Sequence, residues 1–230
     1  MKSEIIVIDY DCGNLGCVYN ALDHLGFTVS IQTIDRVLHL DASNHMILLP
    51  GVGNYTFAIE KIKRIVPLSD FKKWLLSSKK LMCICLGFQL LYHSSLELSK
   101  SDNAHNNLKE STDGLSVFSS SVEPFGSNEN PSLNIGWRRS ISHASNEIVS
   151  DKIHNLIVSH CFYHMHSFGI PLHNHSSFDH KKYDWFVTSN HTQSGVEFIN
   201  SFKYNNILGL QFHPEKSGEY GLELIKLFYA

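Results

Sequence analysis

The fold of this chain follows from residues 81–91, which read Leu-Met-Cys-Ile-Cys-Leu-Gly-Phe-Gln-Leu-Leu. The apolar run 81–85 is typical of a buried strand, and it passes into a helical pattern without a loop. Such a strand-to-helix turn lifts its central side chain out of the sheet and needs small residues two positions away on each side. Gly87 and Cys83 meet this need. The stretch therefore predicts an α/β protein that presents Cys85 at the end of a strand.

Two cysteines in this stretch compete for the role of nucleophile. Most cysteines are small buried residues of the core. Cys85 stands where the helix begins, and a helix N-terminus favours thiolate over thiol. Cys83 lies earlier in the strand and lacks that advantage. We therefore assign Cys85 as the nucleophile and Cys83 as a packing residue.

The first half of the chain alternates short apolar runs with amphipathic stretches. Strands are expected over residues 5–8, 28–32, 45–49 and 81–85, and helices over 14–25, 71–77 and 87–94. This βαβαβ rhythm predicts parallel core strands with helices on both faces of the sheet.

The second half begins after a polar stretch at residues 99–113, which is expected to be a loop. Further strands are expected over residues 117–124, 136–142, 157–166, 185–190, 195–202 and 207–212, with a closing helix over 221–229. Short turns between these strands predict antiparallel additions to the sheet. No repeat or linker divides the chain, so residues 1–230 are expected to form a single domain. Its fold class is an open mixed α/β sheet of the flavodoxin-like kind.

Composition narrows the classes of function. The net charge of −3, with no long run of Lys or Arg, argues against a nucleic-acid or anionic-membrane surface. No apolar run reaches the roughly 20 residues that span a bilayer, and the start of the chain lacks the features of a signal peptide. Five cysteines, an odd number, suit a reduced protein. We expect a cytoplasmic protein.

Fifteen histidines raise the question of a metal site. Two pairs stand close in sequence, namely His164 with His166 and His173 with His175. The chain has no H-E-x-x-H and no C-x-x-C motif, and spacing alone is weak evidence. We expect neither a metal nor another cofactor.

The closing segment, residues 209–218, reads Gly-Leu-Gln-Phe-His-Pro-Glu-Lys-Ser-Gly. Pro214 favours extended backbone before it, and side chains two apart in extended backbone project to the same side. His213 and Glu215 can then converge, with the carboxylate orienting an imidazole base. Parallel strands end at the same edge of a sheet, where open α/β folds bind ligands. Cys85, His213 and Glu215 are expected to meet there.

These motifs resemble class I (triad-type) glutamine amidotransferases. More closely, the chain is similar to the glutaminase subunits of imidazole glycerol phosphate synthases, and the resemblance runs from end to end. It rests on the elbow at 85–91, on Gln-Phe-His-Pro-Glu-Lys-Ser at 211–217, on Ile-Asp-Tyr at 8–10 with Gly-Asn-Leu at 13–15, on Leu-Pro-Gly-Val-Gly at 49–53, on Ile-Gly-Trp at 135–137 and on Phe-Tyr-His-Met-His-Ser-Phe at 162–168.

The resemblance implies a role for each matching residue. Cys85 attacks the glutamine carboxamide, His213 activates Cys85, and Glu215 orients His213. The oxyanion hole would be formed by backbone amides of Leu86 and of the loop Gly51, Val52 and Gly53. The amino-acid end of glutamine would be held by Gln89, Ser167 and Phe168. The loop alone also reads as a Pro-Gly turn that ends a strand.

The resemblance also implies a partner. The glutaminase hydrolyses glutamine to glutamate and passes ammonia to a separate (β/α)8-barrel cyclase, forming a heterodimer. The cyclase makes imidazole glycerol phosphate and aminoimidazole carboxamide ribotide in histidine biosynthesis. Low activity is implied until the partner binds substrate, because the Gly51–Gly53 loop must reorganise.

Three alternatives remain open at the level of sequence. A paralogous glutaminase could supply ammonia to a partner that amidates a sugar for surface polysaccharides. The residues Arg138 and Arg139 after Trp137, where the family has Asn, and the long segment 188–195 leave room for this partner. A non-catalytic binding protein on the same fold is disfavoured because the triad is intact. A papain-like protease fits poorly because it has no use for the Pro50–Gly53 loop or for the parallel α/β pattern.

Overall fold

The computed structural model describes residues 4–97, 111–126, 132–143, 151–172, 186–191 and 195–230. The helices are α1 (Leu15–His24), α2 (Ile34–Val37), α3 (Tyr55–Ile65), α4 (Leu68–Leu76), α5 (Leu86–Gln89), α6 (Lys152–Ser159) and α7 (Gly218–Tyr229), with 3-10 turns at Ala42–Asn44 and Pro214–Lys216. The strands are β1 (Glu4–Asp9), β2 (Thr28–Thr33), β3 (Met46–Leu49), β4 (Lys80–Ile84), β5 (Tyr92–Ser95), β6 (Thr112–Asp113), β7 (Phe118–Pro124), β8 (Asn134–Arg139), β9 (Ile141–Ser142), β10 (Cys161–His166), β11 (Phe168–Pro171), β12 (Phe186–His191), β13 (Glu197–Tyr204) and β14 (Ile207–Leu210).

One large mixed sheet organises the described residues. Its main path runs β2-β1-β3-β4-β14-β13-β11-β7-β5-β6. Off this path, β12 pairs with β13, and β9 pairs with β12. The pairs from β2 to β14 are parallel, whereas β13 is antiparallel to both β14 and β11. A parallel core with antiparallel additions is the predicted fold class, and the structure confirms it.

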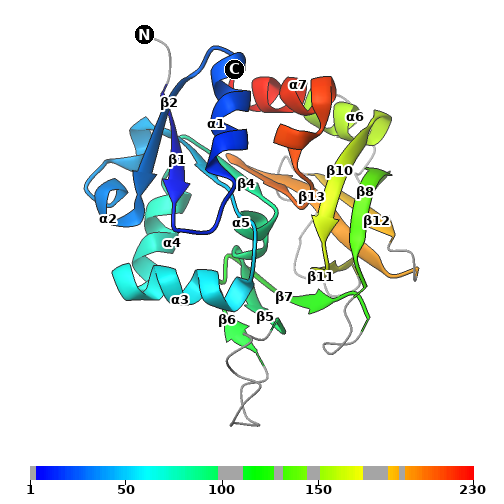
Figure 1. Ribbon diagram of the computed structural model, residues 1–230, viewed down its shortest axis with the longest axis horizontal. Helices are drawn as coiled ribbons and strands as arrows, with labels where there is room; N and C mark the ends of the chain where they lie inside the picture. The colour runs from blue at the N-terminus through cyan, green and yellow to red at the C-terminus, as the bar shows by residue number, and fades with distance from the viewer. Residues whose placement is uncertain (1–3, 98–110, 127–131, 144–150, 173–185, 192–194) are drawn as a thin grey trace.

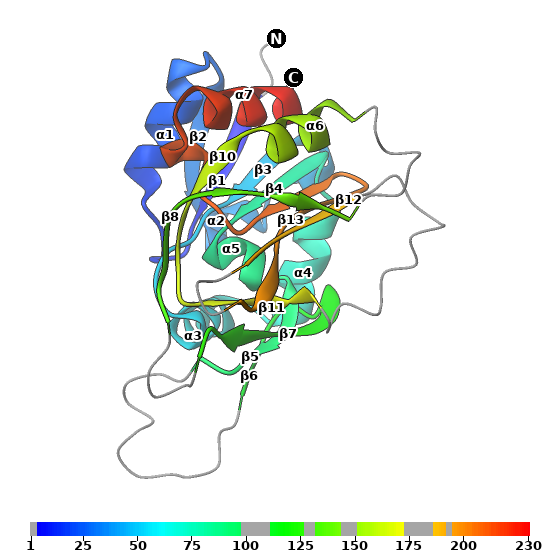
Figure 2. The same cartoon turned by 90° about the vertical axis from the view of Figure 1, so that its right-hand side faces the viewer.

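Helices cover both faces of the parallel strands (Figures 1 and 2). Along β1, Ile6 and Ile8 pack into one core cluster together with α2, α3 and α4. The alternate residues Ile5 and Val7 pack into the other cluster with α1, α6 and α7. Because side chains alternate across a strand, a strand buried on both faces must be apolar throughout. This requirement explains the continuous apolar runs in the sequence.

A separate ribbon of β8 and β10 lies beside the sheet (Figure 1). It is tied to the closing segment because His213 N–H donates to Tyr163 O at 2.9 Å. It is also continuous with β11, which joins the main sheet through β13. The ribbon therefore connects the main sheet and the closing segment to residues 165–168, which line the pocket described below.

Several element predictions were wrong. The helix expected over 87–94 is a single turn ending at Gln89, and Tyr92–Ser95 form β5, paired with β7 and β6. Part of the stretch expected as a loop, Thr112–Asp113, is the short strand β6. Residues 98–110 and 173–185, with His173 and His175, lie outside the described residues, as do 192–194.

Three helices escaped the sequence analysis, namely the short α2 together with α3 and α6. The strand expected from residue 157 begins only at Cys161, because α6 extends to Ser159 and starts at Asp151, whose carboxylate caps Ile153 N–H at 2.8 Å. Helix α3 starts where Asn54 Oδ1 accepts from Phe57 N–H at 2.9 Å. Helices α3 and α6 each start with a side-chain cap, which is a sequence signal for a helix start. The expected elements were based on the short apolar runs and not on this signal. No helix in the described part of the chain is long and apolar enough to cross a membrane.

Candidate active site

Cys85 occupies a strained turn between β4 and α5. Its backbone has φ 52° and ψ −107°, a conformation that costs a non-glycine residue about 1–3 kcal/mol. The turn is held from the neighbouring parallel strand, because Cys85 N–H donates to Leu210 O at 2.7 Å. The structure thus places Cys85 at the strand-to-helix turn that the sequence predicted, with the sulfur reaching the edge of a pocket.

Gly87 and Cys83, the small residues on either side of Cys85, are small for different structural reasons. A Cβ on Gly87 would lie 2.1 Å from Leu49 O, so only glycine allows the elbow to approach the end of β3. Cys83 is fully buried in the core, and burial raises the pKa of its thiol far above the usual value. A neutral buried thiol suits the packing role assigned to Cys83.

His213 and Glu215 form a buried pair. His213 Nδ1–H donates to Glu215 Oε1 at 2.7 Å, and their side chains are 1% and 3% exposed. Burial alone would lower the pKa of His213, but the nearby Cys85 sulfur and the Glu215 carboxylate outweigh it and raise the pKa to about 10. His213 Nε2 has no hydrogen-bond partner among the described residues, and the Cys85 sulfur lies near without completing a bond to it. The arrangement favours a protonated imidazole ring at His213 beside the Cys85 sulfur.

The backbone of this pair differs from the expected extended segment. His213 itself is extended, but Pro214–Lys216 form a 3-10 turn. Lys216 N–H and Ser217 Oγ–H both donate to His213 O, at 3.1 and 2.6 Å. Convergence of His213 and Glu215 therefore comes from a tight turn rather than from strand alternation, and that part of the prediction was wrong.

The loop Gly51–Gly53 lies against the elbow, and one of its backbone N–H groups is engaged in a hydrogen bond. The peptide between Gly51 and Val52 accepts Leu86 N–H on its oxygen at 3.3 Å, while its own N–H donates to Cys12 O at 3.3 Å. Rotating this one peptide would free Leu86 N–H and turn Val52 N–H toward the same space. Two preorganised N–H donors are what an oxyanion requires. The structure therefore holds a conformation in which these two amides do not face a substrate.

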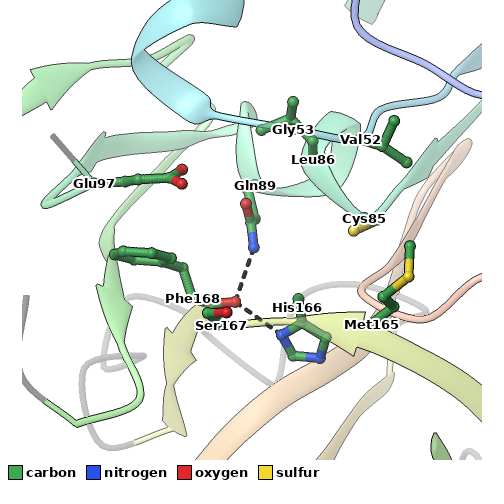
Figure 3. Close-up of a pocket in the computed structure, with 10 residues that line it drawn as sticks. All are labelled: Val52, Gly53, Cys85, Leu86, Gln89, Glu97, Met165, His166, Ser167 and Phe168. Atoms are coloured by element: carbon green, nitrogen blue, oxygen red, sulfur yellow. Dashed lines mark hydrogen bonds between the residues drawn. The ribbon is translucent and has the colours of Figure 1, made fainter. Parts of the chain in front are cut away.

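A pocket of about 330 Å³ opens in front of Cys85 (Figure 3). Among its lining residues are seven of the predicted site residues, namely Val52, Gly53, Cys85, Leu86, Gln89, Ser167 and Phe168. Gly51, His213 and Glu215 are not among them and lie buried behind the surface of the pocket.

Three further residues line the pocket that sequence reasoning did not assign. Met165 and His166 end β10 directly before the predicted Ser167, so position alone could have suggested them. Glu97 had no such signal. Its carboxylate accepts from Tyr55 N–H at 2.8 Å across 42 residues of sequence, and it points toward Gln89 (Figure 3). Burial raises the pKa of Glu97, although hydrogen bonds from Tyr55 N–H and from the Asn54 side chain oppose the rise.

Two buried histidines, His164 and the pocket-lining His166, form a hydrogen-bonded pair. His166 Nδ1–H donates to Phe168 O at 2.8 Å, so its Nε2 is an acceptor, shared by His164 Nδ1–H at 3.0 Å and Asn134 Nδ2–H at 3.1 Å. Burial lowers the pKa of both rings, that of His166 to about 3. Both histidines are therefore neutral in the folded protein at neutral pH.

These histidines predict sensitivity to acid. As pH falls below about 6.5, the unfolded chain takes up protons that the folded chain does not, and each such histidine lowers stability by about 1.4 kcal/mol per pH unit. We expect His164→Phe, which keeps a ring against Phe198 and Phe212, to reduce that slope by about 1.4 kcal/mol per unit between pH 6 and 4. Urea denaturation across this range measures it. The control is His39→Gln at an exposed position; an equal slope in wild type and His164→Phe would contradict the expectation.

No cluster of three or more His, Cys, Asp or Glu side chains placed to hold a metal ion occurs within the described ranges. The five cysteines are free thiols. The site combines a cysteine on a strained elbow, a buried His–Glu pair, the Gly51–Gly53 loop and a polar pocket. This is the constellation of nucleophilic acyl transfer.

Comparison with known proteins agrees with this chemistry. Imidazole glycerol phosphate synthase subunit hisH of Cyanidium caldarium is 30% identical over 99% of this chain and 98% of its own length. Subunit HisH of Pyrobaculum aerophilum is 31% identical over 97% and 96%. Imidazole glycerol phosphate synthase hisHF of Arabidopsis thaliana is 31% identical over 98% of this chain but only 34% of its own length.

Solved structures support the fold. PurLQS from Thermotoga maritima matches with a TM-score of 0.61 at 18% identity, covering 99% of this chain and 98% of that chain. A crystal structure of a glutamine amidotransferase matches with a TM-score of 0.60 at 13% identity, covering 98% and 99%. The model of the family "Glutamine amidotransferase class-I" matches residues 6–230. The chain belongs to the class-I glutamine amidotransferase family.

Proposed function

We propose that residues 1–230 act as one glutaminase domain that supplies ammonia to an imidazole glycerol phosphate synthase. The observation that carries the proposal is the Cys85 elbow beside the buried pair of His213 and Glu215, within a chain similar over nearly its whole length to subunits of that synthase. These relatives favour the histidine-pathway acceptor over sugar amidation.

The chemistry begins with the Cys85 thiolate. It attacks the carboxamide carbon of glutamine, and the negative charge moves to the carboxamide oxygen. Rotation of the Gly51–Val52 peptide provides Leu86 N–H and Val52 N–H for that oxyanion, and each donor of this kind contributes about 3 kcal/mol. Collapse of the intermediate breaks the C–N bond as His213 gives its Nε2 proton to the leaving nitrogen.

The second half of the reaction releases glutamate. Water attacks the thioester on Cys85, and His213, now neutral, accepts the proton from that water. Glu215 keeps Nδ1–H of His213 in place throughout, at 2.7 Å. The ammonia produced passes to the acceptor site of a cyclase of the (β/α)8-barrel kind, which forms a complex with this protein in the cytoplasm.

Recognition of glutamine uses the polar wall of the pocket. The substrate carries an α-ammonium group, and Glu97 provides a carboxylate in the lining. Gln89, Ser167 and Phe168 line the same wall and complete the cradle for the amino-acid end. A charge-assisted hydrogen bond between Glu97 and the ammonium is stronger than a neutral one.

This role predicts the effect of Glu97→Gln. Removing the charge should raise the KM for glutamine about tenfold or more, since a hydrogen bond to a charged group contributes about 1.5–3 kcal/mol. The value of kcat should change little, because the group lies away from the reacting carbon. Steady-state glutaminase assays measure both constants, with the exposed Glu60→Gln as control. An unchanged KM for glutamine in Glu97→Gln would contradict a role of Glu97 in binding the substrate.

The proposed function is tested with the partner. The protein is mixed with a histidine-pathway cyclase, and glutamine-dependent formation of imidazole glycerol phosphate is measured beside ammonia-dependent formation. We expect a stable complex and glutamine-dependent product. Co-purification instead with a sugar-modifying enzyme, and no product with the cyclase, would contradict the proposal.

A further inference from the structure

Gln211 lies directly beside the proposed nucleophile. It follows β14, is fully buried, and is the residue after Leu210, whose carbonyl anchors the backbone of Cys85. Its side-chain nitrogen Nε2 donates to Cys85 Sγ at 3.7 Å. Its oxygen Oε1 accepts from Gln89 Nε2–H at 3.1 Å. The amide therefore bridges the sulfur and the wall of the pocket.

The orientation of this amide is fixed by one backbone carbonyl. Phe168 O can only accept, and the side-chain atom of Gln89 that lies 2.9 Å from it must therefore be Nε2 (Figure 3). That same Nε2 faces Gln211, so the atom of Gln211 that faces it must be the acceptor Oε1. The remaining atom of the Gln211 amide, the donor Nε2, is left facing Cys85. A flipped amide would place two donors together.

We propose that Gln211 is a catalytic residue that holds the Cys85 sulfur as a thiolate through its Nε2–H. Hydrogen bonds to a charged form favour that form, and a buried donor acts strongly because little water competes with it. The inference rests on the proposed role of Cys85 and deepens it. His213 provides the positive charge near the sulfur, whereas Gln211 provides a neutral donor that no proton transfer removes.

Several ionisable groups in the described part of the chain lie near the sulfur, and Glu97 and His166 line the same pocket. His213 with Glu215 approaches from the closing segment, and Tyr10 approaches from the end of β1 with its hydroxyl donating to Pro50 O at 2.5 Å. Cys83 lies below on β4. None of these is replaced by a change at Gln211, so a shift in the reactivity of Cys85 reports on the amide itself.

The test measures the alkylation rate of Cys85 by iodoacetamide against pH, without glutamine or partner, by mass spectrometry of the Cys85 peptide. The exposed Cys161 and half-buried Cys17 are changed to Ser in the background. We expect Gln211→Met to slow alkylation at pH 7 about tenfold and to move the midpoint upward by about one pH unit, as the loss of one charge-assisted hydrogen bond implies. Gln211→Glu, which keeps the acceptor for Gln89 but removes the donor, should slow it further.

A matched control is Asn200→Leu. Asn200 is an equally buried amide on the adjacent β13, but its side chain donates to Ser140 Oγ at 2.8 Å, away from the sulfur. It should lower stability without moving the alkylation profile. In glutaminase assays, Gln211→Met should lower kcat.

The outcomes separate this inference from the proposed function. A wild-type alkylation profile in Gln211→Met overturns the role of Gln211, even where glutaminase activity depends on Cys85. If Gln211→Met does not fold, Gln211→Glu decides in its place: a wild-type or faster rate at pH 7 overturns the role. Glutaminase activity that persists without Cys85 contradicts the proposed function itself, whatever the profile.

Discussion

Replacing Cys85 by Ser should reduce glutamine hydrolysis by at least about 10³-fold with the synthase partner present. Loss of a nucleophile removes the covalent route entirely, and the remaining rate comes only from the oxyanion donors and substrate binding. Serine keeps the shape of the side chain but is not a thiolate at neutral pH. The measurement is glutamate release at saturating glutamine, together with mass spectrometry for a glutamyl thioester in the wild-type protein.

Cys83 provides the matched control, because it lies two residues away on the same strand. It is fully buried and its thiol is neutral. Cys83→Ala should retain wild-type kcat at a stability cost of about 1 kcal/mol for the small cavity. If glutaminase activity were lost in Cys83→Ala and retained in Cys85→Ser, Cys83 would be the nucleophile and Cys85 the packing residue. Ammonia-dependent synthesis by the partner should be unaffected in both variants.

The parallel core and the elbow could be predicted from sequence because both depend on local constraints. Strands buried on both faces must be apolar throughout, as along Ile5–Ile8, and a strand that turns into a helix at once needs a small residue such as Gly87. The elbow and the closing segment predicted the nucleophile Cys85 and the base His213, and the resemblance added the oxyanion loop. These predictions did not require knowledge of which distant segments touch.

The errors came from features that depend on tertiary contacts. Residues 92–95 contain apolar and polar residues compatible with helix, and they are a strand only because β6 and β7 lie beside them. Glu97 enters the pocket because Tyr55 N–H holds it, across 42 residues. The direction of the Gln211 amide depends on Phe168 O through Gln89. The spacing of apolar residues along the sequence gives no information about hydrogen bonds between residues so far apart in the chain.

The contact between Gly87 and the end of β3 leads to the second large expected effect. In Gly87→Ala, the new Cβ would lie 2.1 Å from Leu49 O, 2.9 Å from Leu49 C and 3.0 Å from Pro50 O, all of them backbone atoms. Backbone cannot move aside as a flexible side chain can, so either the elbow or the Leu49–Pro50 segment must shift. We expect a loss of about 3 kcal/mol or more in the free energy of unfolding.

The same shift should reach the chemistry, because Leu49 and Pro50 lead directly into the oxyanion loop at Gly51. Displacing one oxyanion donor lowers kcat by about 10²–10³-fold. Denaturant unfolding and glutaminase kinetics of Gly87→Ala test the two effects together. Gly16→Ala is the control, since its nearest atom, Asn14 Oδ1, lies 4.0 Å away and alanine is favourable inside α1. Wild-type stability and kcat in Gly87→Ala would mean that the elbow tolerates a side chain there, and that close contact with β3 is not what positions Cys85.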